Sequence, residues 1–564
     1  MIDRRRFWGI CAAMGVAGTG FVDALWAQAQ EAPDSPITAE MIAAAEGVAG
    51  IEFTADEREM MRDGLARNEQ AYEAIRALEI GNEVAPALLF EPDLPGVDAP
   101  IADGADELRA TPWPGLARPA GDDELAYASV GQLGELLATR QISALELTDI
   151  YLERLERYDP HLLFQVTATA ERARRAAGQA DQERAAGRVR GPLHGIPWGA
   201  KDLFAVDGYP TSWGAAPYRD QRLEGDATVV QRLDAAGAVL VAKLTLGALA
   251  MGDVWFGGRT RNPWKPEQGS SGSSAGPGSA TAAGCVGFAI GTETRGSIVS
   301  PATRNGVTGF RPTFGRVSRH GAMALSWSMD KIGPMCRSAE DCALVFAAIH
   351  GADGRDASAR TTPFRWSAER DPRTLRVGFL ERAFESAEGY ANRDFDLETL
   401  RVLREDVGIE LHPVELPDFP VDALGFILTA EAGAAFDELT RSGHDDELTR
   451  QGRNAWPNIL RSARMIPAVE YIQANRARAI YQVQLAEALR DVDVVVAPSY
   501  QMGILGATNL TGQPCVAVPN GFRDDGTPVS ISFIGNLYQD AEALEVAHAY
   551  QKATDFHLRR PTLP

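Results

Sequence analysis

Hydrophobic positions follow two different patterns on either side of a proline-rich stretch. Between residues 38 and 78 apolar residues recur at helical spacing, which predicts an amphipathic pair of helices. Prolines then recur between residues 86 and 119, a composition typical of a linker or of a segment that wraps a surface. We therefore expect a small helical appendage, followed by a main domain that begins near residue 121.

Beyond residue 121, helical and strand-like patterns alternate. Residues 143–158 have the apolar spacing of a helix, and residues 238–242 form a short apolar run typical of a buried strand. Later apolar runs predict further strands of the same sheet, at residues 492–497, 515–518 and 529–533. This alternation predicts an α/β fold, and the lack of a fixed repeat excludes a solenoid.

The first 29 residues have the features of an export signal. Arg4, Arg5 and Arg6 form a twin-arginine cluster, and a moderately apolar run from residue 9 to residue 26 follows it. The run is short, rich in glycine and interrupted by Asp23, which disfavours a bilayer span of about 20 residues. Residues 27–29 (Ala-Gln-Ala) form a small-residue cleavage site, which predicts a mature chain in a bacterial periplasm or outside the cell.

These patterns divide the chain into three expected parts. They are a signal peptide at residues 1–29, a helical segment with a proline-rich linker at 30–120, and a main α/β domain at 121–564.

Charge and composition exclude several classes of function. The chain has 564 residues and a net charge of -22, which would repel nucleic acid and anionic membrane surfaces. Cysteines and histidines are scattered without ligand spacing, so neither a metal nor a cofactor is predicted. The four cysteines beyond the signal are expected to be buried thiols: Cys285, Cys336, Cys342 and Cys515. Pairing in an oxidising compartment stays open, with Cys336 and Cys342 closest in sequence.

Three short motifs carry the candidate chemistry. The first motif is residues 195–202 (Gly-Ile-Pro-Trp-Gly-Ala-Lys-Asp), in which Lys201 directly follows a short apolar run. Lys201 could act as a base if burial kept it neutral. Residues 269–279 form a Gly/Ser loop that runs straight into an apolar segment, which disfavours a flexible linker. Residues 291–298 (Gly-Thr-Glu-Thr-Arg-Gly-Ser-Ile) form a turn that could expose a serine hydroxyl beside several backbone N–H groups.

Together these motifs resemble the amidase signature family. The lysine after Gly-Ile-Pro, Asn-Pro-Trp at residues 262–264, the Gly/Ser loop and the Gly-Ser-Ile turn occur in the family's order, and residues 509–514 extend the likeness towards the C-terminus. The resemblance implies a mixed central sheet covered by helices and a serine amidase that forms a covalent acyl-enzyme. It assigns Ser297 as the nucleophile, Ser273 as the bridging serine after a cis peptide bond, and Lys201 as the base.

The same resemblance implies an oxyanion hole made of backbone N–H groups from Thr294, Arg295, Gly296 and Ser297. The chain departs from the commonest family pattern at Ser271 and Ala275, where glycine is usual, and at Val299, where arginine is frequent. Arg295 also replaces a glycine, and could be a substrate contact or a surface side chain.

Other functions fit parts of the same sequence. Residues 272–276 match the G-x-S-x-G elbow of α/β-hydrolases with Ser274 as nucleophile, but the polar residues before it do not predict the strand that an elbow requires. An esterase or carbamate hydrolase could use the amidase site itself, and an inactive binding protein is a less economical alternative.

The chain is also similar to one component of glutamyl-tRNA amidotransferase, its amidase-like A subunit, which works in a cytoplasmic complex. The export signal and the acidic charge disfavour that role. The expected partner is a small-molecule amide, without nucleic acid and without stable membrane insertion. Acyl and amine specificity stay open, as does the oligomeric state, for which a homodimer is one option.

Overall fold

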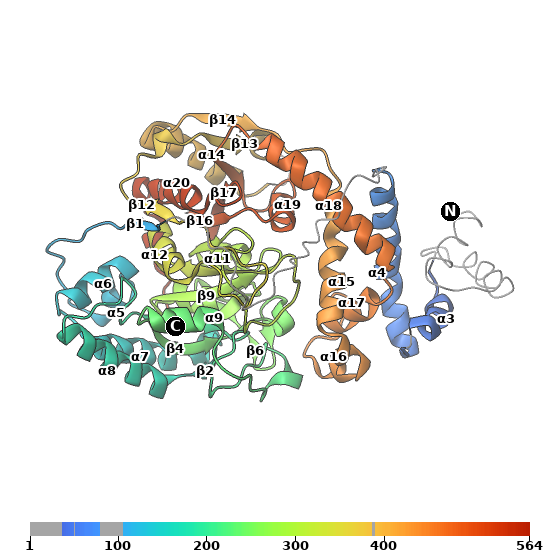
Figure 1. The fold of residues 1–564 in the computed structure, drawn as a ribbon, viewed down its shortest axis with the longest axis horizontal. Coiled ribbons are helices and arrows are strands. Elements are labelled where there is room, and N and C mark those ends of the chain that lie inside the picture. The colour runs from blue at the N-terminus through green and yellow to red at the C-terminus, as the bar shows by residue number, and fades with distance from the viewer. Residues whose placement is uncertain (1–36, 50, 79–104, 386–389, 564) are drawn as a thin grey trace. The chain divides into compact units, whose positions relative to one another are not determined.

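The structure is a computed structural model that describes residues 37–49, 51–78, 105–385 and 390–563 (Figure 1). The predicted signal peptide lies outside the described residues. Residue contacts divide the chain into two compact units. The larger, here called the sheet unit, comprises residues 90–323, 329–417 and 485–564, and the smaller, here called the helical unit, comprises residues 1–89, 324–328 and 418–484. Residues 418–484, which the sequence analysis assigned to the main domain, thus group with the N-terminal helices.

A mixed sheet of eleven described strands forms the centre of the sheet unit. Most neighbouring strands are antiparallel, whereas β3 pairs in parallel with β4 and β9, and β13 pairs in parallel with β14 and β15. The strand order is β14 (Leu411–Val414), β13 (Val377–Leu380), β15 (Val494–Pro498), β17 (Pro528–Gly535), β16 (Cys515–Phe522), β10 (Thr308–Arg311), β11 (Lys331–Cys336), β9 (Phe288–Glu293), β3 (Pro197–Lys201), β4 (Val239–Leu244) and β2 (Gln165–Ala168). The predicted α/β fold with a mixed sheet is confirmed.

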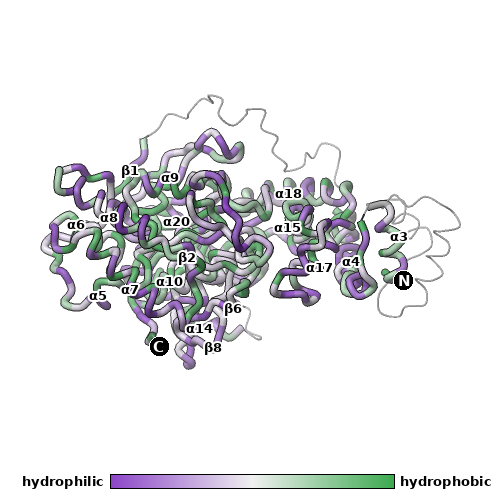
Figure 2. The backbone as a smooth tube through the Cα atoms, turned by 90° about the horizontal axis from the view of Figure 1, so that it is seen from below, coloured by the Kyte–Doolittle hydropathy of each residue, from purple (hydrophilic) through white to green (hydrophobic). Residues whose placement is uncertain are grey.

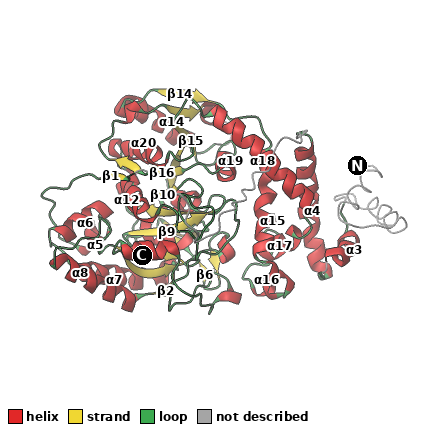
Figure 3. Cartoon of the chain, in the orientation of Figure 1, coloured by secondary structure: helices red, strands yellow, loops and turns green. Residues whose placement is uncertain are grey.

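Helices enclose this sheet within the unit (Figure 3). Helix α10 packs on β3, β4, β9 and β11, while α11 packs on β10, β16 and β17. The helices are α5 (Asp122–Ala126), α6 (Val130–Ala138), α7 (Ala144–Leu162), α8 (Ala170–Ala185), α9 (Thr228–Ala235), α10 (Ala275–Ala282), α11 (Val299–Asn305), α12 (Ala339–Ile349), α13 (Glu381–Glu385), α14 (Arg393–Arg401), α19 (Ile504–Thr511) and α20 (Asp540–Ala553).

Local sequence signals explain where these elements begin. Helix α7 follows Ser143, whose side chain accepts a hydrogen bond from the N–H of Glu146, so the predicted helix at residues 143–158 has a capped start. Every residue of β4 is buried, as expected for a strand covered on both faces. The apolar runs predicted as late strands are β15, β16 and β17.

Part of the proline-rich segment belongs to the sheet unit. Strand β1 (Glu107–Arg109) pairs in parallel with β12 (Arg365–Ser367), so this part of the chain wraps the unit. The backbone N–H and the hydroxyl of Thr111 then donate to the carboxylate of Glu340 in α12, at 2.6 and 2.9 Å. Shorter pairings complete the strands: β5 (Val254–Trp255) with β6 (Gly258–Arg259), and β7 (Arg261–Asn262) with β8 (Lys265–Gly269).

The helical unit contains the predicted N-terminal pair, with α3 at Ala39–Ala49 and α4 at Ala55–Arg76. Thr54 and Glu57 form a capping box at the start of α4, a helix that is mostly hydrophilic along its length (Figure 2). Helix α4 packs on α17, where Arg461 bridges Glu57 and Asp445. The remaining helices are α15 (Phe426–Ala435), α16 (Asp437–Arg441), α17 (Trp456–Ala463) and most of α18 (Ala468–Ala488).

The cysteines agree with their predicted role as buried thiols. Cys285, Cys336, Cys342 and Cys515 are buried and free. Among the described residues, no helix combines the length and the apolar character needed to cross a bilayer.

Candidate active site

Lys201 is the last residue of β3 and is completely buried. Its Nζ lies 2.9 Å from Ser273 Oγ, 3.1 Å from Ser274 Oγ and 2.8 Å from Thr292 Oγ1. These three partners are hydroxyls, and the fourth is the carbonyl oxygen of Thr292 at 3.4 Å, so none of them is a carboxylate that would neutralise the ammonium form of this lysine. The structure therefore brings together two of the three predicted catalytic side chains, Lys201 and Ser273.

Burial changes the acidity of this lysine. Removal from water lowers the pKa of Lys201 to about 7, although the negative charges of Asp330 and Glu293 partly oppose the shift. An unperturbed lysine has a pKa of about 10.4 and is almost entirely protonated at neutral pH. A substantial fraction of Lys201 is therefore neutral near pH 7 and able to accept a proton.

The Gly/Ser loop follows a tightly constrained path. The peptide bond between Gly272 and Ser273 is cis. A Cβ atom at Gly272 would lie only 1.9 Å from the carbonyl oxygen of Gly252, so the loop requires glycine there. Ser271, where the family usually has glycine, has a φ of 60°, and its Oγ lies 2.7 Å from Ser300 Oγ. The departure at Ser271 thus keeps the glycine-like backbone and adds a side-chain contact.

The turn that holds Ser297 lies between β9 and α11. Gly296 has a φ of 93°, a left-handed conformation that favours glycine just before the serine. The carbonyl of Ser297 accepts a hydrogen bond from the N–H of Ser274 at 3.1 Å. This bond joins the turn to the loop immediately after Ser273.

The other predicted oxyanion residues precede Ser297 in the same turn. Thr294 is anchored by a 2.6 Å bond from its hydroxyl to Asp330 Oδ1. Arg295 has an exposed side chain, and its guanidinium lies against Gly506 in α19. Its φ is not positive, so a residue with a side chain fits where the family usually has glycine.

A buried carboxylate supports this turn and was not predicted. Glu293 Oε2 accepts hydrogen bonds from the N–H groups of Ile298 and Val299, at 2.8 and 2.9 Å. Its Oε1 pairs with Arg311 at 2.7 Å. Burial alone would raise the pKa of Glu293, but Arg311 and the N–H of Val299 hold it at about 2. Glu293 lies in the motif at residues 291–298, so its position in the sequence was known, but no chemical role was predicted for it.

The C-terminal motif at residues 509–514 completes the same network. Asn509 Nδ2 donates to Glu293 Oε1 at 2.7 Å, and Arg311 Nη2 donates to Thr508 Oγ1 and to the carbonyl of Gln513. These residues hold the support for the serine turn, which explains why a distant motif accompanies the catalytic ones.

The structure also bears on the alternative nucleophile, Ser274. Its Oγ donates to the carbonyl of Thr292 and accepts from the N–H of Thr292, besides contacting Lys201. A serine–histidine pair would need an imidazole here, yet His548 and His557 line a different cavity. These contacts disfavour the α/β-hydrolase elbow. The expectation that no strand precedes the Gly/Ser loop was wrong, because the polar residues 265–269 form β8 by pairing with β7. Sequence reasoning missed Ser274 and Thr292 as lysine partners, because the contact of Thr292 depends on the pairing of β9 with β3 and that of Ser274 on how the loop before α10 packs.

Comparison with known proteins agrees with this geometry. The family model described as Amidase matches residues 146–503, more than half of the chain. The chain belongs to the amidase signature family. Membership of this family supports the interpretation that the chain is a hydrolase acting on carbon–nitrogen bonds.

Several curated relatives of this amidase family member are A subunits of glutamyl-tRNA(Gln) amidotransferase. The one from Halorhodospira halophila is 34% identical over 484 residues, covering 77% of this chain and 98% of the relative. Its counterpart from Roseiflexus castenholzii is 35% identical over 488 residues, covering 78% and 98%.

Solved structures of similar fold include amidases. The peptide amidase from Stenotrophomonas maltophilia is 29% identical with a TM-score of 0.66, covering 78% of this chain and 98% of that chain. An amidase family protein from Bacillus anthracis is 25% identical with a TM-score of 0.69, covering 78% and 94%. The predicted family and fold are thus confirmed.

Proposed function

We propose that this chain is a serine amidase that hydrolyses a small-molecule amide through a covalent acyl-enzyme. The observation that carries the proposal is the pairing of a buried Lys201, with a pKa of about 7, with the hydroxyl of Ser273 at 2.9 Å. A lysine that is neutral near physiological pH and contacts a serine has the chemistry of a general base.

In the proposed reaction, Lys201 accepts the proton of Ser273 while Ser273 accepts the proton of Ser297. The freed Ser297 oxygen attacks the amide carbon and forms a tetrahedral intermediate. Ser273 then returns a proton to the departing amine, the carbon–nitrogen bond breaks, and the acyl group stays on Ser297. Water attacks this ester by the same proton route, which releases a carboxylic acid and restores the enzyme.

The oxyanion of that intermediate would be stabilised by backbone N–H groups of residues 294–297. The Glu293 carboxylate supports this role because it binds the two following N–H groups and thereby fixes the end of the turn. Preorganised donors of this kind commonly contribute about 10²–10³-fold per donor to turnover.

A substrate screen with matched blanks tests the proposal. The purified mature chain and its Ser297→Ala variant are assayed against amides, esters and carbamates, and intact mass spectrometry is used to detect an acyl adduct. We expect turnover of at least one amide, an adduct on the wild-type chain, and neither in Ser297→Ala. Amide hydrolysis that persists in folded Ser297→Ala would overturn the assignment. Faster turnover of esters or carbamates than of amides would change the proposed substrate class but would leave the proposed catalytic residues unchanged.

A second candidate function is that of the amidase-like component of an amidotransferase, which the identity of the curated relatives favours. Such a component would release ammonia from glutamine and would need partner proteins for its full reaction. Glutaminase activity that appears only with added amidotransferase partners would support this candidate. Hydrolysis of other amides by the isolated chain would support the first.

We also propose export to the periplasm or beyond the cell, supported by the twin-arginine cluster and the Ala-Gln-Ala site at residues 27–29. N-terminal sequencing of the exported protein should find a first residue close to Gln30. Retention of Met1, or export that is insensitive to replacing Arg4 and Arg5 by lysine, would contradict this proposal.

A further inference from the structure

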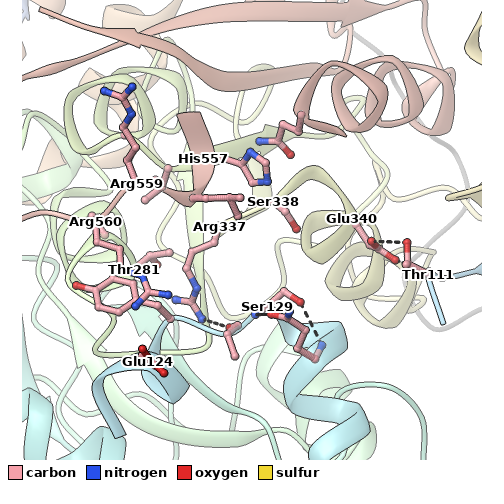
Figure 4. Close-up of a pocket in the computed structure, with 18 of the residues that line it drawn as sticks. Thr111, Glu124, Ser129, Thr281, Arg337, Ser338, Glu340, His557, Arg559 and Arg560 are labelled. Carbon is pink, nitrogen blue, oxygen red and sulfur yellow. Dashed lines mark hydrogen bonds between the residues drawn. The ribbon is translucent and has the colours of Figure 1, made fainter. Parts of the chain in front are cut away.

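The sheet unit holds a cavity of about 680 Å³ that is not lined by the candidate catalytic residues (Figure 4). Several parts of the chain meet around it: the segment from residue 111 to residue 136, Trp264, the ends of α10 and α11, residues 337–340, and the C-terminal residues 548–560. Its volume lies within the range of about 300–1,000 Å³ that is typical of small-molecule sites.

The cavity is separated from the serines by two helices. Helix α10 begins just after Ser274 and reaches the cavity at Thr281 and Ala282, while α11 begins just after Ser297 and reaches it at Asn305. An eight-residue helix is about 12 Å long, so the cavity lies about one helix length from the candidate catalytic site.

Much of the cavity wall is apolar or aromatic, but several buried polar atoms face no partner. Among the described residues, no hydrogen-bond partner is found for Trp113 Nε1, Tyr127 Oη, Arg337 Nε, His548 Nε2 or His557 Nδ1. Indole and guanidinium N–H groups can only donate, and a buried donor without an acceptor is costly, by about 1–3 kcal/mol. Trp113 Nε1 and Arg337 Nε are donors of this kind, and the Tyr127 hydroxyl and the two imidazoles can also donate, so a ligand that supplies acceptors would pair with these atoms.

Charge indicates which acceptor fits. The positively charged side chains of the wall outnumber the negatively charged ones. The positive residues are Arg337, Lys552, Arg559 and Arg560, and the negative residues are Glu124 and Glu340. Both oxygens of Glu340 are already engaged by Thr111, and Glu124 is exposed. This positive excess is notable in a chain with a net charge of -22.

Two of the cations are placed to meet an anion inside the cavity. Arg337 is fixed by bonds from its terminal nitrogens to the carbonyls of Val286 and Ala128, at 3.0 and 2.8 Å, which leaves its Nε–H. Arg560 lies with its guanidinium carbon 4.8 Å from the centre of the Tyr127 ring. Figure 4 shows Arg559 pointing away from this pair, so we assign it no role in the site.

The two histidines contribute neutral groups. Burial lowers the pKa of His548 and of His557 to about 4, and nearby positive charge adds to the shift at His548, whereas the acidic Asp555 opposes it at His557. Both rings are therefore uncharged at neutral pH. They add polar contacts without changing the charge of the cavity.

We propose that this cavity is a binding site for a small organic acid that combines one carboxylate with an apolar or aromatic body. The carboxylate would accept from Arg337 Nε–H, the Tyr127 hydroxyl and Arg560. The body would occupy the apolar wall, which includes Trp113, Leu136 and Trp264. The site is independent of the proposed amidase reaction because Lys201, Ser273 and Ser297 do not line it.

Calorimetric titration of the Ser297→Ala chain, which blocks turnover of the probes, tests this site. The probes are phenylacetate and octanoate, with phenylacetamide as the uncharged match of phenylacetate. We expect one carboxylate to bind at a single site, and phenylacetamide to bind at least tenfold more weakly because it lacks the charge that the arginines recognise.

Variants in the same background locate the binding. Arg560→Gln and Tyr127→Phe should each weaken carboxylate binding about tenfold, with unchanged circular dichroism, because each removes one charge-assisted or neutral donor. Arg175→Gln, an exposed arginine on α8, is the matched control and should bind like the parent.

Arg295→Gln distinguishes this cavity from the catalytic turn. The proposal requires that Arg295→Gln leave carboxylate binding unchanged. It is overturned if neither acid binds at millimolar concentration, which would indicate a cavity that holds water only. Equal binding of phenylacetamide, or weakening by Arg295→Gln and not by Arg560→Gln, would also overturn it.

Discussion

Lys201 and Lys243 lie completely buried on the neighbouring parallel strands β3 and β4, yet their surroundings differ. Lys243 Nζ lies 2.7 Å from the carboxylate of Asp202, which is also completely buried. Lys201 contacts three hydroxyls and one backbone carbonyl instead. Burial lowers the pKa of both lysines, but only Lys243 has a carboxylate at contact distance to oppose the shift.

Strand geometry explains how adjacent residues reach such different sites. Ala200 is paired with Lys243, and Lys201 is paired with Leu244. Because side chains alternate between the faces of a sheet, Lys201 and Lys243 point to opposite faces, and Asp202 points to the face opposite Lys201. One Lys-Asp dipeptide thus supplies a candidate base to one face and an ion-pair partner to the other.

The largest expected effect is on catalysis. Lys201→Met and Lys201→Arg should each reduce turnover by on the order of 10³-fold or more, since neither side chain can accept a proton at neutral pH. Initial rates on an amide that the wild-type chain hydrolyses measure this loss. A folded Lys201→Arg variant with a near wild-type rate and pH profile would show that Lys201 is not the base.

Loss of the second lysine should instead affect stability. Lys243→Met leaves the Asp202 carboxylate buried without its cation, which should lower the free energy of unfolding by about 3–5 kcal/mol. Urea denaturation measures the change. The double variant Lys243→Met with Asp202→Asn should recover part of it, because the buried charge is then absent. No recovery would mean that packing around Lys243, and not the ion pair, dominates.

The variant that abolishes activity should also stabilise the fold. The pKa of Lys201 is about 7 when folded and about 10.4 when unfolded, so unfolding takes up a proton between these values. Its contribution to stability therefore falls as pH decreases through this window, and Lys201→Met, which removes the titrating group, should raise stability at pH 7 by up to about 4 kcal/mol, less what the lost hydrogen bonds of Lys201 contribute. Denaturation at pH 7 and above pH 10.4 measures this gain, which should shrink at the higher pH. A gain of equal size at both would contradict the assignment.

The smallest expected effect concerns Asp330, whose negative charge partly opposes the lowering of the Lys201 pKa. Asp330→Asn removes a negative charge that raises the pKa of Lys201, so that pKa should fall further below its usual value. More of the lysine would then be neutral at low pH, and the acid limb of the pH–rate profile should move to lower pH by a fraction of a unit. A shift to higher pH would show that Asp330 acts through its bond to Thr294 instead.

The sequence predicted the parts of this arrangement that depend on local spacing. Ser143 capped its helix and the buried apolar runs became strands, because those signals act within a few residues. The motif register led to Lys201 and Ser273 through resemblance, and the two side chains do lie in contact.

Long-range pairing was not accessible in the same way. The bond from Asn509 to Glu293 and the grouping of residues 418–484 with α4 join positions hundreds of residues apart, and no periodicity encodes such partners. Thr292 illustrates the same limit, since its contact with Lys201 arises when β3 and β9 pair side by side. Ser274 reaches Lys201 from the loop before α10, which itself packs on β3 and β9.

The bond between Asn509 and Glu293 has a consequence for the time at which the enzyme is complete during synthesis. Ribosomes make the chain from the N-terminus, so Lys201, Ser273 and Ser297 all emerge long before residues 508–513, which hold Arg311 and Glu293 in place. A nascent or truncated chain that ends before residue 508 carries every candidate reactive group but lacks the residues that fix the serine turn. Synthesis must therefore proceed beyond residue 513 before the turn that carries Ser297 can be fixed.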